Sequence, residues 1–375
     1  MIQLNAFSKL LKQGGINFLS GVPCSYLKNL INYSLNHLNY IAATNEGEAI
    51  AIAAGVYLGG QRSAVLMQNS GLMNAVGPLT SLNYVFKIPV LGFVSLRGEP
   101  AITDEPQHIL TGQITHPLLD LCRIKTLWME RQIDAVAQQM AYADDFLTKG
   151  ESVFFIVRKG TFADHQLEQQ FTFDNYAKEY IKSEKVCKHP KRFDALTILA
   201  ANANDNTLFL ATTGKTGREL FELSDQPSNL YMVGSMGCIS SIGLGLAMAK
   251  PNKEIIAIDG DGSLLMRMGS LATNGYYRPN NMLHICLDNG CHDSTGGQDS
   301  VSRNVELARI AHFSGYPCSV ETNSLEELNT FVKSWQKDKK LTFIHMQTAK
   351  GSKKDLGRPT VSPIQVKERF MEYLK

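Results

Sequence analysis

The chain has 375 residues, of which 44% are hydrophobic and 19% are charged, and its formal net charge is +2. This length is typical of two or three domains, and this composition provides enough apolar residues for buried cores. A net charge so close to zero, without a long basic run, argues against a nucleic-acid partner.

The sequence shows no sign of a membrane or secretory segment. Its N-terminus lacks the basic and apolar regions of a signal peptide, and its apolar runs are too short to span a bilayer. The seven cysteines have no CxxC spacing, and their odd number argues against a disulfide framework. We therefore expect a cytoplasmic protein in a reducing compartment, with no membrane partner.

The first 165 residues alternate between short β-rich apolar runs and helical patterns. Strands are predicted at residues 17–20, 40–43, 64–67, 89–94 and 152–157. Helices are predicted from the turn at 21–23 through residue 30, and at 46–58, 72–85 and 132–146. Strands separated by helices of this length indicate right-handed βαβ crossovers and a parallel sheet covered on both faces.

The alternation stops in a polar, charged range, residues 166–192, which is predicted to be a linker. Beyond it, strands are predicted at 207–210, 255–258, 282–287 and 341–346. Helices are predicted at 217–223, 238–249, 263–277, 304–314 and 325–335. The sequence thus predicts an α/β protein with two tandem doubly wound domains and mainly parallel sheets, at residues 1–165 and 193–375.

The segment 259–263 combines acidic residues with glycines directly after a predicted strand, and Asn289 follows the next predicted strand. Both strand ends lie at the carboxyl edge of a sheet, where open α/β sheets bind ligands, so we expect Asp261 and Asn289 side by side. Gly262 allows the backbone to approach a phosphate, and a helix opening at Ser263 offers free N–H groups to an anion. A carboxylate, an amide oxygen and a nearby backbone carbonyl are ligands that Mg²⁺ prefers. A Gly-Asp-Gly alone is usually a simple turn; the strand, helix and strand around it make the pattern more specific.

This pattern resembles the cofactor motif of the thiamine-diphosphate-dependent enzymes. The similarity extends over most of the chain and is closest to the phosphonopyruvate decarboxylases and the related sulfopyruvate decarboxylases. Other matching stretches are residues 20–23, 45–49, 67–71, 97–100, 104–108, 212–216, 234–237 and 356–360. The resemblance implies a pyrimidine-binding domain followed by a diphosphate-binding domain, with thiamine diphosphate and Mg²⁺ as cofactors.

The resemblance also implies roles for single residues. Glu46 matches the catalytic glutamate that hydrogen-bonds the aminopyrimidine ring and controls its protonation. Glu48 is a neighbouring alternative, and Glu46 alone would also suit the positive end of a helix dipole. Met236 matches the apolar residue under the bend of the cofactor, and the carbonyl of Gly234 matches the acceptor of its amino group.

The implied contacts to the diphosphate and the metal all lie in the second domain. They are Gly214, Lys215, Thr216, Asp261, Gly262, Ser263 and Asn289, with Asp261, Asn289 and Cys291 as the metal positions. The turn 214–216 also resembles the end of a P-loop, but Phe209 occupies the place of the first glycine of that motif, so this alternative is weak.

A 2-oxo acid that carries a phosphonate or sulfonate needs cationic or N–H partners. The candidates for substrate binding are Ser25, Arg97, His108, His292 and Arg358. Each also has an ordinary alternative, because surface arginines and hydrogen-bonded histidines are common. The run 292–298 resembles the phosphonopyruvate enzymes more than the sulfopyruvate enzymes, whereas Cys24 departs from the acidic residue usual in its turn.

The resemblance implies non-oxidative decarboxylation of 3-phosphonopyruvate to phosphonoacetaldehyde and CO₂. A sulfopyruvate decarboxylase and a carboligase are alternatives with the same cofactor; a non-catalytic cofactor-binding protein is disfavoured because Glu46, Asp261 and Asn289 are all present. The resemblance further implies a homo-oligomer, at least a dimer, with the site at the subunit interface. The segment 350–363 is either a closing lid or an ordinary connection.

Overall fold

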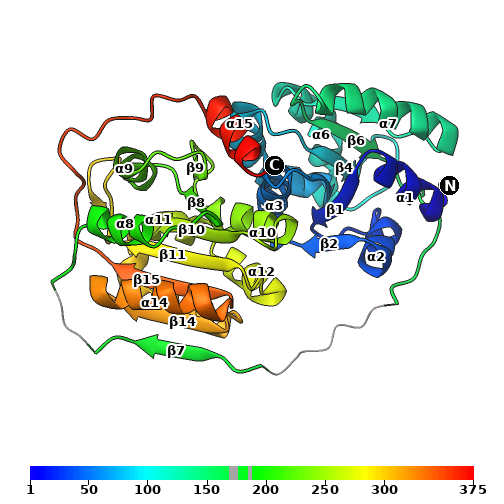
Figure 1. The fold of residues 1–375 in the computed structure, drawn as a ribbon. Helices are drawn as coiled ribbons and strands as arrows, with labels where there is room; N and C mark the ends of the chain where they lie inside the picture. The colour runs from blue at the N-terminus through cyan, green and yellow to red at the C-terminus, as the bar shows by residue number, and fades with distance from the viewer. Residues whose placement is uncertain (169–175, 185–187) are drawn as a thin grey trace. The chain divides into compact units, whose positions relative to one another are not determined.

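The computed structural model describes residues 1–168, 176–184 and 188–375. The described residues form two compact units, one within residues 1–168 and the other within residues 176–375. The predicted linker, residues 166–192, covers this division, and its residues 169–175 and 185–187 lie outside the described part of the chain. Figure 1 labels the helices and strands of both units.

The first unit contains a six-stranded sheet in which all neighbouring strands are parallel. Its order is β2-β1-β3-β4-β6-β5, which places a crossover point between β1 and β3. The strands are β1 (Ile16–Gly21), β2 (Asn39–Ala42), β3 (Arg62–Gln68), β4 (Leu91–Ser95), β5 (Lys125–Trp128) and β6 (Val153–Val157). The α-helices are α1 (Leu4–Gln13), α2 (Lys28–His37), α3 (Glu46–Leu58), α4 (Leu72–Pro78), α5 (Tyr84–Phe86), α6 (Ile109–Leu121) and α7 (Ile133–Leu147).

Helices cover both faces of this sheet, because successive residues of a strand point to opposite sides. Phe155 packs in a core with residues of α1, α2 and α7, whereas the adjacent Phe154 packs in a second core with residues of α3, α4 and α6. Strand β6 is buried along its whole length, and α3 is buried at every position except Tyr57. Continuous burial of this kind is what a parallel sheet between two helical layers requires.

The second unit repeats this topology. Its seven-stranded sheet has the order β7-β14-β15-β11-β10-β8-β9, so that β8, β9, β10, β11, β14 and β15 follow the same order as β1 to β6. The strands are β7 (Glu179–Lys182), β8 (Thr207–Ala211), β9 (Asn229–Tyr231), β10 (Glu254–Gly260), β11 (Met282–Asp288), β14 (Cys318–Thr322) and β15 (Thr342–Gln347). A short antiparallel hairpin, β12 (Cys291–His292) and β13 (Gln298–Asp299), follows β11. The fold confirms the prediction of two doubly wound α/β units with mainly parallel sheets.

The helices of the second unit connect these strands. They are α8 (Arg192–Ala201), α9 (Lys215–Leu223), α10 (Ile239–Ala249), α11 (Asp261–Met266), α12 (Ser270–Tyr277), α13 (Leu307–Phe313), α14 (Leu325–Asp338) and α15 (Pro363–Tyr373). Because every pair within the seven-stranded sheet is parallel, the carboxyl ends of β8, β10 and β11 meet at one edge. The crossover point of this sheet lies between β8 and β10.

Several elements differ from the sequence prediction. The helix expected over residues 263–277 is two helices, α11 and α12, because the chain leaves the helical conformation at Arg267, before Gly269. The helix expected to end at residue 30 is α2, which continues to His37. Within the range predicted as a linker, β7 pairs with β14 as an edge strand, and Figure 1 shows it at the border of the sheet.

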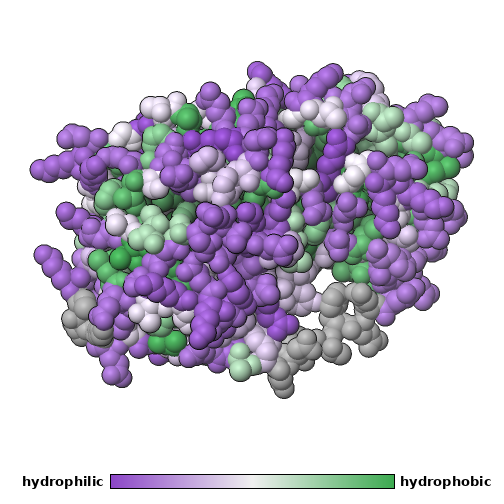
Figure 2. Space-filling view, in the orientation of Figure 1, coloured by the Kyte–Doolittle hydropathy of each residue, from purple (hydrophilic) through white to green (hydrophobic). Residues whose placement is uncertain are grey.

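None of the described helices is long and apolar enough to cross a membrane. On the face shown in Figure 2, hydrophilic residues cover most of the surface and hydrophobic residues form small separate patches.

Candidate active site

In the first unit, Glu46 lies directly beyond the carboxyl end of β2, as the first residue of α3. Its side chain is buried, and its Oε2 accepts a hydrogen bond of 2.9 Å from Nδ2 of Asn74. Asn45 caps α3, because its side chain accepts from the backbone N–H of Glu48. The carboxylate of Glu46 is therefore held at the sheet edge by a helix whose start is fixed in position.

The structure separates the roles of the two neighbouring glutamates. Oε2 of Glu48 accepts from the backbone N–H of Thr44 at 2.7 Å and from the hydroxyl of the same residue at 2.5 Å. Glu48 thus folds back onto the residue before the helix cap and closes the turn. These contacts favour Glu46 over Glu48 as the carboxylate available for chemistry.

Gly71 supplies the space that the Glu46 side chain occupies. A Cβ atom at this position would lie 1.8 Å from Oε1 and 2.1 Å from Cδ of Glu46. Gly71 follows β3, in the short helical turn Asn69–Gly71. Any larger residue here would force the carboxylate to move, so Gly71 belongs to the site although it carries no functional group.

Two of the residues predicted to bind the substrate meet in the first unit. Arg97 follows β4 and donates from Nη1 to Oγ of Ser25 at 3.1 Å. The same guanidinium forms a bidentate ion pair with Asp104, through Nε at 2.7 Å and through Nη2. Hydrogen bonds from Arg97 lower the pKa of Asp104, and backbone N–H groups of Gly98 and Glu105 act in the same direction. Asp104 therefore balances the charge of Arg97, and Nη1 of Arg97 acts as a directional hydrogen-bond donor on the side of Ser25.

His108 also lies in this unit, at the end of the turn Pro106–His108. Its side chain is buried, and Nδ1 has no hydrogen-bond partner among the described residues. The main chain around it is tightly packed, since a Cβ at Gly98 would lie 1.9 Å from the carbonyl oxygen of His108. A buried imidazole nitrogen without a partner is suited to a ligand oxygen.

In the second unit, Asp261 and Asn289 follow the paired strands β10 and β11. Gly260 and Leu287 are partners in the register of these strands, so Asp261 comes one residue after the pair and Asn289 comes two residues after it. Both side chains are buried. Both also line one pocket at the carboxyl edge of the sheet, as the parallel βαβ arrangement predicts.

Most of the predicted cofactor residues line this pocket. The lining residues are Arg192, Thr212, Thr213, Lys215, Thr216, Met236, Gly260, Asp261, Gly262, Ser263, Leu287, Asn289, Cys291, His292, Asp293 and Ser294. Gly214 and Gly234 are outside the lining but adopt positive φ angles of 100° and 72° in the loops that carry Lys215 and Met236. Arg358 is exposed and does not line this pocket.

Ser263 holds the pocket loops together. Its hydroxyl accepts from the backbone N–H of Gly237 at 3.0 Å and lies 2.9 Å from the hydroxyl of Thr212. These bonds connect the loop of Met236 to the end of β8 and to α11. His292 closes another side, because a Cβ at Gly262 would lie 2.5 Å from Cε1 of its ring.

A buried ionic network orients Asn289. Nδ2 of Asn289 donates to Oδ2 of Asp293 at 2.7 Å, and the same oxygen accepts from Nη1 of Arg192 at 3.2 Å. Arg192 donates from Nε to Glu219 at 2.8 Å, and both of these side chains are at most 5% exposed. Oδ1 of Asp293 accepts from the thiol of Cys291 at 3.2 Å. The sequence motif did not identify Arg192 or Asp293, because neither has a signature outside the three-dimensional fold.

The pKa values of the two carboxylates at this edge are shifted in opposite directions. Burial and the charge of Asp288 raise the pKa of Asp261, which accepts a hydrogen bond of 3.0 Å from Ser302. Burial acts to raise the pKa of Asp288 too, but the hydrogen bond and charge of His345, at 2.9 Å, lower it overall. Two neighbouring carboxylates in a buried place favour the binding of a cation.

The segment 350–363 contacts the same network. Its backbone N–H groups at Gly351 and Lys353 donate to Asp293 and Glu219, at 3.2 Å and 3.1 Å. The segment between these contacts and α15 has no helix or strand. These bonds attach the start of the segment to the pocket wall.

The pocket residues fit a magnesium ion and a diphosphate. Asp261 and Asn289 offer a carboxylate and an amide oxygen, which are hard ligands for Mg²⁺. Lys215 and Thr216 begin α9, and the free backbone N–H groups of a helix N-terminus are suited to bind an anion. Nη2 of Arg192 is buried without a hydrogen-bond partner among the described residues, so it too suits an anionic oxygen.

Comparisons with known proteins identify the family. The model of the N-terminal binding domain of thiamine pyrophosphate enzymes matches residues 4–118, and that of their C-terminal binding domain matches residues 213–346. The chain belongs to the thiamine pyrophosphate enzymes, and it carries both of the family's cofactor-binding domains.

Within the family, the chain is similar to decarboxylases of small 2-oxo acids. A phosphonopyruvate decarboxylase of Streptomyces viridochromogenes is 38% identical over 96% of this chain and 92% of that protein. A sulfopyruvate decarboxylase of Methanosarcina acetivorans is 30% identical over 98% of this chain and 96% of that protein. The solved structure of benzoylformate decarboxylase from Polynucleobacter necessarius, at 13% identity and a TM-score of 0.72 over 93% of this chain and 99% of that one, shares the fold.

Proposed function

We propose that the protein catalyses the thiamine-diphosphate-dependent, non-oxidative decarboxylation of 3-phosphonopyruvate to phosphonoacetaldehyde and CO₂. The observation that carries this proposal is the 38% identity to a phosphonopyruvate decarboxylase over 96% of the chain. Two groups of side chains support it chemically. Asp261 and Asn289 lie at the carboxyl edge of the sheet in the second unit, and Glu46 lies at the carboxyl edge of the sheet in the first unit. Thiamine diphosphate, when bound, supplies the electron sink for the carbon–carbon bond that breaks.

Each domain has a defined task in this proposal. Residues 1–165 bind the pyrimidine and residues 193–375 bind the diphosphate, with residues 166–192 between them. Asp261, Asn289 and the backbone carbonyl of Cys291 hold Mg²⁺. Residues Gly214, Lys215, Thr216, Gly262 and Ser263 surround the diphosphate, while Gly234 and Met236 support the remainder of the cofactor. These assignments rest on position in the sequence and on the shared pocket.

Glu46 controls a proton in the proposed mechanism. Its carboxyl group would hydrogen-bond the aminopyrimidine ring of bound thiamine diphosphate and hold the proton there, and its burial would strengthen this hydrogen bond. Asn74 donates to Oε2 and thereby leaves Oε1, which points at Gly71, for the proton that moves. A buried carboxylate fixed by one donor is well oriented for this exchange.

The groups proposed to bind the substrate anion are hydrogen-bond donors together with one exposed arginine, Arg358. Arg97 is neutralised by Asp104 but keeps Nη1 directed at Ser25. His108 has an unpartnered Nδ1 in the described structure, and His292 lines the cofactor pocket. Arg358, which is exposed, would contribute only if the segment 350–363 changes its position. We propose Ser25, Arg97, His108, His292 and Arg358 as the substrate-binding set.

Sulfopyruvate is the alternative substrate, favoured by the 30% identity to a sulfopyruvate decarboxylase over 98% of the chain. A phosphonate and a sulfonate have similar shapes but differ in charge, since a phosphonate can carry two negative charges and a sulfonate carries one. Turnover of the two acids therefore decides between these functions.

We further propose a homo-oligomer, at least a dimer, that works in the cytoplasm. The described cysteines are all free thiols, which suits a reducing compartment. Light scattering of the purified protein with and without cofactor measures the oligomer directly, and a monomer with full activity would contradict this part of the proposal.

The decisive experiment supplies 3-phosphonopyruvate or sulfopyruvate to the purified protein, with thiamine diphosphate and Mg²⁺ each added or withheld. We expect release of CO₂ and phosphonoacetaldehyde from 3-phosphonopyruvate only when both cofactors are present. A higher kcat/KM for sulfopyruvate would make sulfopyruvate the substrate in place of 3-phosphonopyruvate. If neither acid released CO₂, the proposed decarboxylation would be contradicted. Product analysis with an added aldehyde tests the carboligase alternative.

A further inference from the structure

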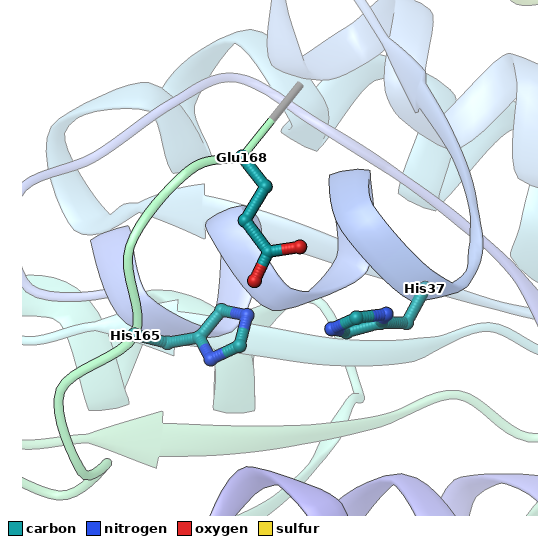
Figure 3. Close-up of side chains that lie close together, drawn as sticks. All are labelled: His37, His165 and Glu168. Atoms are coloured by element: carbon teal, nitrogen blue, oxygen red, sulfur yellow. The ribbon is translucent and has the colours of Figure 1, made fainter.

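A second group of ligating side chains lies in the first unit, away from the pockets described above. It consists of His37, the last residue of α2, together with His165 and Glu168, which follow β6 in the chain. One nitrogen or oxygen atom of each residue lies within 4.8 Å of the corresponding atoms of the other two. Figure 3 shows the two imidazole rings and the carboxylate turned toward a common space.

Three asparagines of α2 position the segment 164–168 that carries two of these groups. They are Asn29, Asn32 and Asn36, which share one face of the helix because they are spaced by three and four residues. Asn29 accepts from the backbone N–H of His165 at 3.3 Å, and Asn32 donates to its carbonyl at 2.9 Å. Asn36 donates to the carbonyl of Gln166 at 3.0 Å and accepts from the N–H of Glu168 at 3.1 Å.

These hydrogen bonds fix the backbone on both sides of His165, so its ring and the Glu168 carboxylate are held against the end of α2. The buried side chain of Tyr33 packs against both imidazoles, with ring centroids 4.6 Å from His37 and 5.1 Å from His165. His37 and Glu168 are exposed and His165 is half-buried, so the cluster lies at the surface on a backbone that these hydrogen bonds fix. Preorganised ligands are what a metal site needs.

We propose that His37, His165 and Glu168 form a binding site for one divalent transition metal ion, with zinc as the probe. Two imidazole nitrogens and a carboxylate are a common ligand set for zinc, and a fourth position remains for water. Ligand atoms around a tetrahedral zinc with bonds of about 2.1 Å lie about 3.4 Å apart. The ligand atoms now lie within 4.8 Å of one another, so binding of the ion would draw them closer together through side-chain rotation.

One hydrogen bond changes when the metal binds through Nε2 of His165. This nitrogen lies 3.2 Å from Nδ2 of Asn36, and the metal takes the place of that contact. Asn36 keeps its two bonds to the backbone of Gln166 and Glu168, so the frame stays intact. Hard Mg²⁺ prefers an all-oxygen set, so the cluster discriminates in favour of softer ions.

The cluster is distinct from the candidate active site of the same unit. His37 precedes the start of β2, whereas Glu46 follows the end of β2, so the two lie at opposite edges of the sheet. Metal bound here would connect α2 to residues 164–168 and stabilise that attachment. It would not take part in decarboxylation, and the proposal does not depend on the substrate.

Zinc titration of the holoenzyme tests the site. The protein, cleared of trace metals and then saturated with Mg²⁺ and thiamine diphosphate, is titrated with Zn²⁺ by calorimetry, and thermal unfolding is followed with and without zinc. We expect one zinc per chain in the first unit and a higher unfolding temperature. The double variant His37→Gln/His165→Gln should bind zinc at least about tenfold more weakly at this site and lose the thermal shift, with kcat unchanged.

His116→Gln is the matched control, because His116 is a partly exposed histidine that pairs with Asp120 on α6. This variant should bind zinc like the wild type. Co²⁺ in place of zinc provides a second readout, since its visible absorption reports nitrogen ligands and should disappear in the double variant. Equal zinc affinity and equal thermal shift in the wild type and the double variant would overturn the proposal.

Discussion

Asn289 donates from Nδ2 to Oδ2 of Asp293 at 2.7 Å, while its Oδ1 accepts from the backbone N–H of Cys291 at 3.2 Å. The two bonds together orient the amide, with Nδ2 toward Asp293 and Oδ1 toward the backbone of Cys291. A carbonyl oxygen has two lone pairs, so Oδ1 keeps one for a cation. The orientation of a predicted metal ligand thus depends on Asp293, a residue outside the cofactor motif, and through it on Arg192.

Replacement of Asp293 by asparagine should weaken the binding of Mg²⁺ and thiamine diphosphate. The new amide cannot form an ion pair with Arg192, whose side chain is 5% exposed, and it holds Asn289 less firmly. Loss of a group that orients a metal ligand typically costs about 10- to 100-fold in affinity. Calorimetric titration of the apoprotein with Mg²⁺ and cofactor measures the change. Asp205→Asn, an exposed position of the same unit, should leave affinity unchanged; equal affinities in both variants would exclude the role of Asp293.

Glu46→Gln should abolish most of the activity while the fold is kept. Asn74 can still donate to the oxygen of the new amide, but the amide cannot exchange a proton with the cofactor ring. General acid–base groups contribute about 10²- to 10⁴-fold, so we expect kcat to fall by that factor. Glu48→Gln is the matched control, because an amide oxygen can still accept from Thr44. Comparable loss in the two variants, or full turnover of Glu46→Gln, would contradict the assignment.

Gly71→Ala tests the position of Glu46 without changing any functional group. The new Cβ would lie 1.8 Å from Oε1 of Glu46, so the carboxylate must move by more than 1 Å to reach an ordinary van der Waals contact. Displacement of about 1 Å can cost about 10²-fold in rate, and we expect a loss of this order in kcat.

Gly77→Ala is the control for this substitution. No atom lies within 4 Å of a Cβ built at Gly77, which is inside α4. This variant should keep full activity and gain about 0.5–1 kcal/mol of stability, because alanine loses less backbone entropy than glycine in a helix. Steady-state kinetics and thermal unfolding of both variants provide the comparison, and normal kcat in Gly71→Ala would show that Glu46 tolerates another position.

The sequence predicted the strands of both sheets best where they are buried and apolar. It placed α3 at residues 46–58, as found, because the caps and apolar run of this helix are local signals. It placed Asp261 and Asn289 together because chain direction alone brings neighbouring parallel strand ends to one edge. These features depend on local pattern and on the rules of βαβ connection.

Other elements lack such local signals. Strand β7 is a half-exposed edge strand, and β14 contains polar residues that are buried only after it pairs with β15. Helix α6 has just two buried residues and contains Pro117, so its periodicity is weak. The contacts of Asp293 with Arg192 and of Gly71 with Glu46 join residues far apart in sequence, and only tertiary structure defines them.

Asp104→Asn tests the ion pair with Arg97 through its dependence on pH. The side chains of Arg97 and Asp104 are 17% and 6% exposed, so the pair is mostly shielded from solvent. At pH 7 we expect the variant to lose about 1.5–3 kcal/mol of unfolding free energy, the range for hydrogen bonds to charged groups. Hydrogen bonds from Arg97 lower the pKa of Asp104 in the folded protein. The contribution of the Asp104 carboxylate to the free energy of unfolding is therefore complete above its pKa in the unfolded chain, about 3.9. This contribution is lost as the pH falls toward the lower pKa of the folded protein.

The stability difference between wild type and Asp104→Asn should be constant from pH 7 to about pH 5. Below about pH 3.9 it should shrink by up to about 1.4 kcal/mol per pH unit, because the wild-type carboxylate gains a proton in the unfolded chain first. Urea unfolding at a series of pH values measures this difference. Asp145→Asn, at an exposed position of α7, should track the wild type throughout. A difference that stays constant down to pH 3 would mean that the Asp104 carboxylate is not held by its ion pair.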